Sequence, residues 1–212
     1  VIENVVEHWN GSIEIGVTGV RPEDVTLPST ATDLSNNCIM ASGTTLMLNG
    51  VTIRNDLPFD LDNCKTSCRI GVMRNGNNIH FFINGVDQGA AHECRAQNIY
   101  AVVDLYGQCS QVSLCCGGNV APYATSENSQ SLQITSIIQP TTDIKHHRFS
   151  VISGNCALLQ NWTVAVRCTN SALSRCLVFS ERNLVAGGEL FEIRIKEMNT
   201  FFAGHIRIGV TD

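Results

Sequence analysis

The sequence predicts an all-β protein folded as an antiparallel β-sandwich, and three observations predict it. Nearly every periodic segment alternates apolar and polar residues with a period of two, which is the pattern of a half-buried strand. Asn-Gly pairs separate some of these segments, and such pairs are typical of hairpin turns. No segment shows the apolar period of an amphipathic helix, and many short strands without helices favour a sandwich.

The first half of the chain supplies half of the expected strands. They lie at residues 11–18, 69–74, 79–83, 99–105 and 111–115. Asn75-Gly76 should turn the second of these strands into the third, because Asn and Gly tolerate a positive φ. Residues 99–105 are almost continuously apolar, so we expect this strand to be central and covered on both faces.

The second half contains a compositional break followed by more strands. Residues 117–145 are mostly rich in Ser, Thr, Gln and Asn and contain two prolines, which predicts a linker. Strands are expected to resume at residues 148–152, 162–168, 176–180, 189–196 and 204–211.

An internal repeat indicates how the chain is organised. Residues 8–19 align without a gap with residues 201–212, sharing the skeleton aromatic, x, Gly, x, Ile, x, Ile, Gly, Val, Thr. A repeat at this large offset is typical of whole domains in tandem. We therefore expect the chain to begin inside one repeat and to end inside the next.

Composition excludes several classes of function. The net charge is −5 and no basic stripe occurs, so nucleic acid is not an expected partner. No apolar run reaches the roughly 20 residues that span a bilayer. The ten cysteines favour thiols in a cytosolic protein, with a disulfide framework as the alternative. Cys64 and Cys68 have a spacing that can suit a metal, but no second pair completes a zinc site.

No catalytic arrangement is apparent, so we expect this chain not to be an enzyme and to need no cofactor or metal. The Gly-x-Ser-x-Gly turn of a serine hydrolase is absent, and no Cys or His has a recognisable catalytic context. His80 lies within a predicted strand and is expected to face the polar side. A sugar-binding sandwich remains an alternative, with Trp9 and Tyr106 as candidate aromatics.

The loops that join the strands are the expected recognition surface, since sandwich domains often bind through them. Arg and Tyr are favoured as interface anchors, and acids and amides supply polar contacts. The candidate protein-binding residues are Arg21, Arg54, Asp56, Arg74, Asn75, Tyr106 and Gln108.

Several of these segments are similar to the neuralized homology repeat. The resemblance is carried by residues 11–18, 69–74, 80–89 and 100–107, and by 178–182 and 188–193, which resemble the front of the same repeat. It implies an SPRY/concanavalin-like sandwich. It also implies that residues 1–116 are the C-terminal two thirds of one repeat, 117–145 a linker, and 146–212 the N-terminal part of the next.

The resemblance further implies a protein-interaction module of a multi-repeat cytoplasmic scaffold. Its implied partners are short segments of proteins in ubiquitin-ligase regulation, Notch-ligand trafficking or centriole-associated complexes, together with adjacent repeats of the same chain. The alternative is the substrate-recognition part of a RING-type ubiquitin ligase. If the front piece folds back onto the back piece as a circularly permuted sandwich, the two copies of the duplicated strand would compete for one slot.

Overall fold

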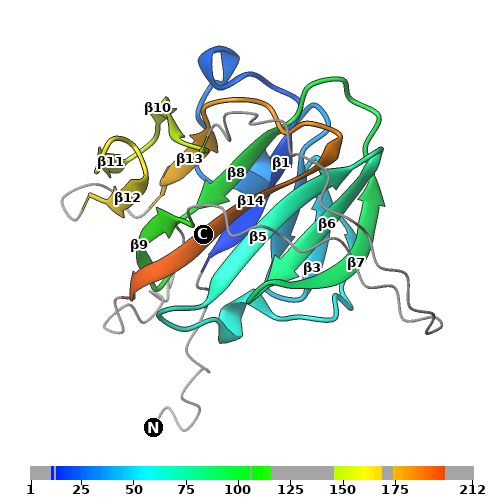
Figure 1. Ribbon diagram of the computed structural model, residues 1–212, viewed down its shortest axis with the longest axis horizontal. Helices are drawn as coiled ribbons and strands as arrows, with labels where there is room; N and C mark the ends of the chain where they lie inside the picture. Colours follow the sequence, from blue (N-terminus) through cyan, green and yellow to red (C-terminus); the bar gives the residue numbers. More distant parts are fainter. Residues whose placement is uncertain (1–10, 12, 106, 116–145, 169–173, 199–212) are drawn as a thin grey trace, which may run out of the picture.

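The computed structural model describes residues 11, 13–105, 107–115, 146–168 and 174–198. In these residues the chain folds into two antiparallel seven-stranded sheets, and the only helical turns are three short 3-10 turns. The two sheets pack face to face (Figure 1). The predicted all-β antiparallel sandwich is therefore confirmed.

The first sheet has the strand order β10-β13-β8-β1-β2-β3-β4. Its strands are β10 (Phe149–Ser153), β13 (Leu177–Ser180), β8 (Tyr100–Asp104), β1 (Glu14–Thr18), β2 (Ile39–Ser42), β3 (Thr45–Leu48) and β4 (Val51–Arg54). The second sheet has the order β11-β12-β9-β14-β5-β6-β7. Its strands are β11 (Cys156–Leu159), β12 (Val164–Arg167), β9 (Cys109–Leu114), β14 (Gly187–Met198), β5 (Arg69–Asn75), β6 (Asn78–Ile83) and β7 (Val86–Glu93).

Strands from the two ends of the chain are interleaved in both sheets. In the first sheet β13 pairs with β8, and Phe179 lies opposite Val102. In the second sheet β14 lies between β9 and β5, so that Ile193 has partners on both sides. The slot between β8 and β2 holds β1, which belongs to the first copy of the duplicated strand. The second copy, at 204–211, and the linker expected at 117–145 lie outside the described residues.

The main core lies between the two sheets and follows from the alternation in the sequence. Ile15 and Val17 of β1 point inward and are fully buried, as are Val72 of β5 and Phe191 of β14. The ring of Phe191 packs edge-on against Phe149 at a centroid distance of 6.1 Å. Each such side chain contributes about 1.5–3 kcal/mol when it is removed from water.

The outer face of the first sheet is covered as well. The segment between β1 and β2 crosses this face, and Ala31, Leu34 and Cys38 form a second buried cluster. Val102 of β8 and Phe179 of β13 complete that cluster from the sheet. This layer explains why the sequence of β8 is apolar on both faces, and it confirms the doubly covered central strand that the sequence predicted.

Candidate protein-binding site

The structure brings two of the predicted site residues together. Arg54 ends the edge strand β4, and its Nε donates a hydrogen bond to Oδ1 of Asp56 at 3.2 Å. Both side chains are exposed, at 40% for Arg54 and 77% for Asp56. A solvated pair of this kind adds little stability. Its charged atoms are therefore available to a partner at small cost to the fold.

The pair lies at the rim of a hollow between the edge strands of the two sheets. Its volume is about 260 Å³. One wall is Arg54 and the loop from Asp56 to Phe59, and the other is formed by residues 88–91 of β7. Phe81 of β6 also lines it, with its ring centroid 5.8 Å from that of Phe59. The hollow thus joins an arginine and an aromatic wall, and these residue types are enriched in protein interfaces.

Local packing fixes the loop that carries this hollow. The buried Leu57 donates its backbone N–H to the carbonyl of Thr44 at 2.9 Å. Leu61 is fully buried, and its N–H donates to the carbonyl of Gly43. Pro58 lies between these two anchors and restricts the backbone further. Phe59 and Phe81 were not predicted as site residues from the sequence. For Phe59, the local signal was its place after Pro58 in a polar loop.

Arg74 does not lie in a loop, contrary to the sequence-based expectation. It belongs to β5, and its side chain is buried, with only 7% of the residue exposed. Its Nε donates to the carbonyl of Gly76 at 3.0 Å, and its Nη1 donates to the carbonyl of Gln97 at 2.8 Å. The guanidinium therefore ties the β5–β6 turn to the segment before β8. Asn75 follows it and is exposed at the turn.

The remaining candidates lie in other parts of the molecule. Arg21 is exposed just before the 3-10 turn Pro22–Asp24. Gln108 is half-buried in the β8–β9 connection, where its backbone N–H donates to the carbonyl of Gly11 at 3.0 Å. Tyr106 lies outside the described residues. The six predicted residues that the structure describes therefore do not form one surface.

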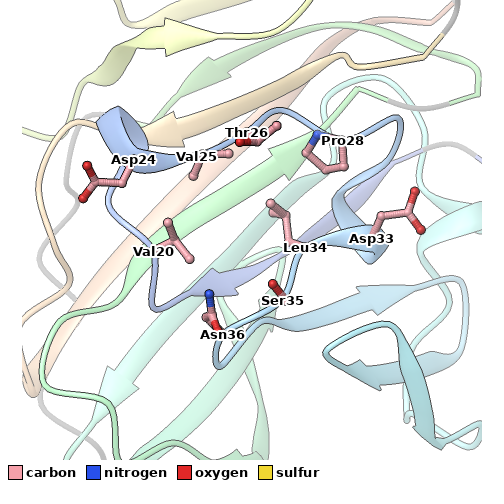
Figure 2. A pocket seen from close by; sticks show the side chains of 9 residues that line it. All are labelled: Val20, Asp24, Val25, Thr26, Pro28, Asp33, Leu34, Ser35 and Asn36. Carbon is pink, nitrogen blue, oxygen red and sulfur yellow. The ribbon is translucent and has the colours of Figure 1, made fainter.

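A second hollow, of about 220 Å³, lies within the segment that covers the first sheet. Figure 2 shows Asp24 and Asp33 at its two sides, with Val20 and Leu34 between them. Arg21 adjoins this segment but does not line the hollow. The carboxylates of Asp24 and Asp33 point away from each other, outward from the hollow (Figure 2).

Two acids lie buried beneath the same segment. Glu14 of β1 and Asp104 of β8 are opposite each other in register and are 5% and 2% exposed. Burial and the charge of Asp104 raise the pKa of Glu14 to about 7, and burial raises the pKa of Asp104 to about 6. Asp104 accepts the backbone N–H of Ala31 at 3.0 Å. Neither acid lines the two hollows, so we assign them to the packing of the segment onto the sheet.

The histidine singled out in the sequence is paired within its own sheet. His80 lies in β6, and its Nδ1 is 3.0 Å from Oδ2 of Asp87 on β7. Among the described residues, no group of three His, Cys, Asp or Glu side chains is placed to hold a metal ion. The described part of the chain also contains no helix long and apolar enough to cross a membrane.

The β-sandwich fold and the hollow beside the Arg54–Asp56 ion pair are the features of a binding module. A family model described as Neuralized matches residues 1–116 and 149–212, and the chain belongs to this family. The Neuralized domain is a protein-interaction module that binds and does not catalyse. The resemblance to neuralized homology repeats noted in the sequence is thereby confirmed at the level of the family.

Proposed function

We propose that this chain is a protein-binding part of a multi-repeat cytoplasmic scaffold and that the hollow beside Arg54 and Asp56 receives a short segment of its partner. The observation that carries the proposal is the placement of this ion pair beside Phe59 and Phe81 in a Neuralized domain. The arginine offers donors to a carboxylate or backbone carbonyl, and the aspartate accepts from a donor.

The edges of the two sheets favour an extended segment as the occupant. Within the described residues, β4 and β7 each have a strand neighbour on one side only. One row of backbone N–H and C=O groups on each edge can therefore pair with an added strand. An apolar side chain of that strand would contact Phe59, and a polar neighbour would reach Arg54.

We also propose how the repeats are organised, which proteins bind to them and where the protein is located. The duplicated strand and the family match to two separated ranges support an out-of-register pair of part-repeats, 1–116 and 146–212. This organisation resembles neuralized-like protein 4, which carries such repeats in succession. The partners would then be proteins of ubiquitin-ligase regulation, Notch-ligand trafficking or centriole-associated complexes, and the location would be cytoplasmic or centriolar.

Affinity capture with the whole chain as bait tests this assignment. The wild-type chain is compared with a double variant, Arg54→Ala with Asp56→Ala, by quantitative mass spectrometry of proteins retained from a cell lysate. The matched control is Glu93→Ala with Arg95→Ala. This pair is likewise exposed, has the same spacing and a 2.9 Å contact, and lies outside the hollow.

Proteins of the three pathways should be retained by the wild type and by the control and lost at least tenfold from the double variant. Equal retention by all three baits would overturn the placement of the surface. Retention of none of these proteins by a folded wild-type chain would overturn the proposed partners. Recovery of ubiquitin-conjugating enzymes through a RING protein would favour the alternative, a substrate-recognition part of a ubiquitin ligase.

A further inference from the structure

Two cysteines lie within contact distance of each other in the lining of a hollow. The Sγ atoms of Cys64 and Cys68 are 3.3 Å apart. Both residues line a hollow of about 510 Å³ together with Phe59, Lys65 and Ile83. Cys64 is buried, whereas Cys68 is half-buried. A small molecule entering the hollow would therefore reach the Cys68 sulfur more readily, with the second thiol behind it.

The backbone holds the two thiols in this arrangement. Cys64 ends the 3-10 turn Leu61–Asn63, and its N–H donates to the carbonyl of Leu61. Cys68 closes the next turn by donating its N–H to the carbonyl of Lys65 at 3.0 Å. The carbonyl of Cys68 accepts the N–H of Ile195 at 3.0 Å, which attaches the turn to β14. To form a disulfide, the sulfurs approach from 3.3 Å to a bond length of about 2.0 Å.

The acid–base properties of the pair divide the roles of the two sulfurs. Hydrogen bonding with Cys64 lowers the pKa of Cys68 to about 7, with a further contribution from the side chain of Asn84. The same contact raises the pKa of Cys64, as do burial and the nearby Asp60 and Asp62. Cys68 is thus the thiol that ionises more readily, while Cys64 holds its proton to higher pH.

We propose that Cys64 and Cys68 form a redox-active dithiol, oxidised to an internal disulfide by a low-molecular-weight disulfide such as oxidised glutathione. The Cys68 thiolate attacks one sulfur of the small disulfide, whose S–S bond breaks, and the first small thiolate leaves and takes up a proton. Cys64 then loses its proton and attacks the Cys68 sulfur, and the second small thiolate leaves. The protein gives up two electrons and two protons, and the small disulfide becomes two thiols.

Formation of the mixed disulfide at Cys68 favours the later attack by Cys64. The largest cause of the raised pKa of Cys64 is its hydrogen bond with Cys68, followed by burial and then by the charge of the Cys68 thiolate. The hydrogen bond and the charge disappear when Cys68 is held in a mixed disulfide, whereas burial remains. Cys64 then ionises more readily, next to the sulfur that it must attack.

The dithiol also adjoins the proposed binding surface. Phe59 lines the hollow beside the cysteines and the hollow beside Arg54. A disulfide between Cys64 and Cys68 would constrain the turn at one end of the same loop. Oxidation would therefore alter the shape of a surface that includes Phe59.

Tryptic peptide mapping tests the proposal directly, because trypsin cleaves after Lys65 and separates the two cysteines. The full chain is reduced, freed of reductant, exposed to oxidised glutathione at neutral pH, quenched with acid, alkylated and digested. We expect peptides 55–65 and 66–69 to be recovered as one linked pair without glutathione. Cys64→Ser should instead leave one glutathione on Cys68, and Cys68→Ser should leave Cys64 unmodified.

Cys168→Ser provides the matched control, since Cys168 is exposed and lies outside this hollow. The linked pair should form in this variant as in the wild type. Recovery of both peptides separately alkylated, or of a separate glutathione on each cysteine in the wild type, would overturn the proposal. Should Cys64→Ser fail to unfold cooperatively, Cys64→Ala replaces it, and the wild-type digestion decides the question without any variant.

Discussion

The buried pair of Glu14 and Asp104 gives a prediction about stability whose sign depends on pH. Replacing Glu14 by Gln keeps the shape of the side chain and removes its charge. Glu14 is 5% exposed, and burial together with the charge of Asp104 raises its pKa from 4.5 to about 7. The carboxylate form of Glu14 is therefore costly in the folded chain.

The direction follows from proton linkage. A carboxyl group whose pKa is raised on folding holds its proton to higher pH in the folded chain than in the unfolded chain. The free energy of unfolding then falls as pH rises between about 4.5 and 7. At about 1.4 kcal/mol for each pH unit, the shift amounts to about 3 kcal/mol above pH 7. Glu14→Gln should raise the free energy of unfolding by up to about 3 kcal/mol at pH 8 and have little effect below pH 5.

Urea unfolding followed by circular dichroism at a series of pH values between 5 and 8 measures this effect. The matched control is Asp56→Asn, which removes an acid that is 77% exposed and should leave the pH dependence unchanged. A Glu14→Gln variant that is less stable than the wild type at pH 8 would refute the reasoning. So would a variant with the same slope of stability against pH as the wild type.

Three further substitutions test the packing and the site. Gly16→Ala places a Cβ in a steric clash with the carbonyl oxygen of Ile39, so thermal unfolding should show a loss of about 3 kcal/mol. Arg74→Ala removes a buried guanidinium that donates to two backbone carbonyls, and urea unfolding should again show a loss of about 3 kcal/mol. Arg54→Ala with Asp56→Ala should cost less than about 1 kcal/mol in the same assay, because that pair is solvated. Equal losses for the buried and the exposed arginine would contradict the roles assigned to them.

Most strands that line the main core were predictable, because local alternation records which face is buried. The exceptions are β2 and β3, which place Ile39 and Leu46 in that core and were not predicted. Nine of the ten expected strands correspond to β1, β5, β6, β8, β9, β10, β12, β13 and β14. The tenth lies outside the described residues. Edge strands carry less of this signal: β4 is exposed throughout, and β7 is half-buried or exposed along its length, so neither was predicted.

Burial that depends on tertiary packing could not be predicted from the sequence. The alternation in β1 predicts that Glu14 faces outward, and it does, but the irregular segment between β1 and β2 folds back over that face. The same limit applies to the site. Arg54 and Asp56 are close in sequence and could be selected together, whereas Phe81 reaches the hollow only through the packing of the second sheet. Arg74 ends the predicted strand 69–74, but its burial could not be predicted because it depends on the distant carbonyl of Gln97.

The position of β14 has a consequence for synthesis on the ribosome. This strand is the last described in the chain, yet it separates β9 from β5 in the middle of the second sheet. While the chain is being made, the earlier strands leave the ribosome with their central neighbour missing. At usual elongation rates this interval lasts on the order of 5 to 15 seconds. During that time the inner edges of β5 and β9 are open to other chains, so nascent molecules should depend on chaperones until residue 198 has emerged.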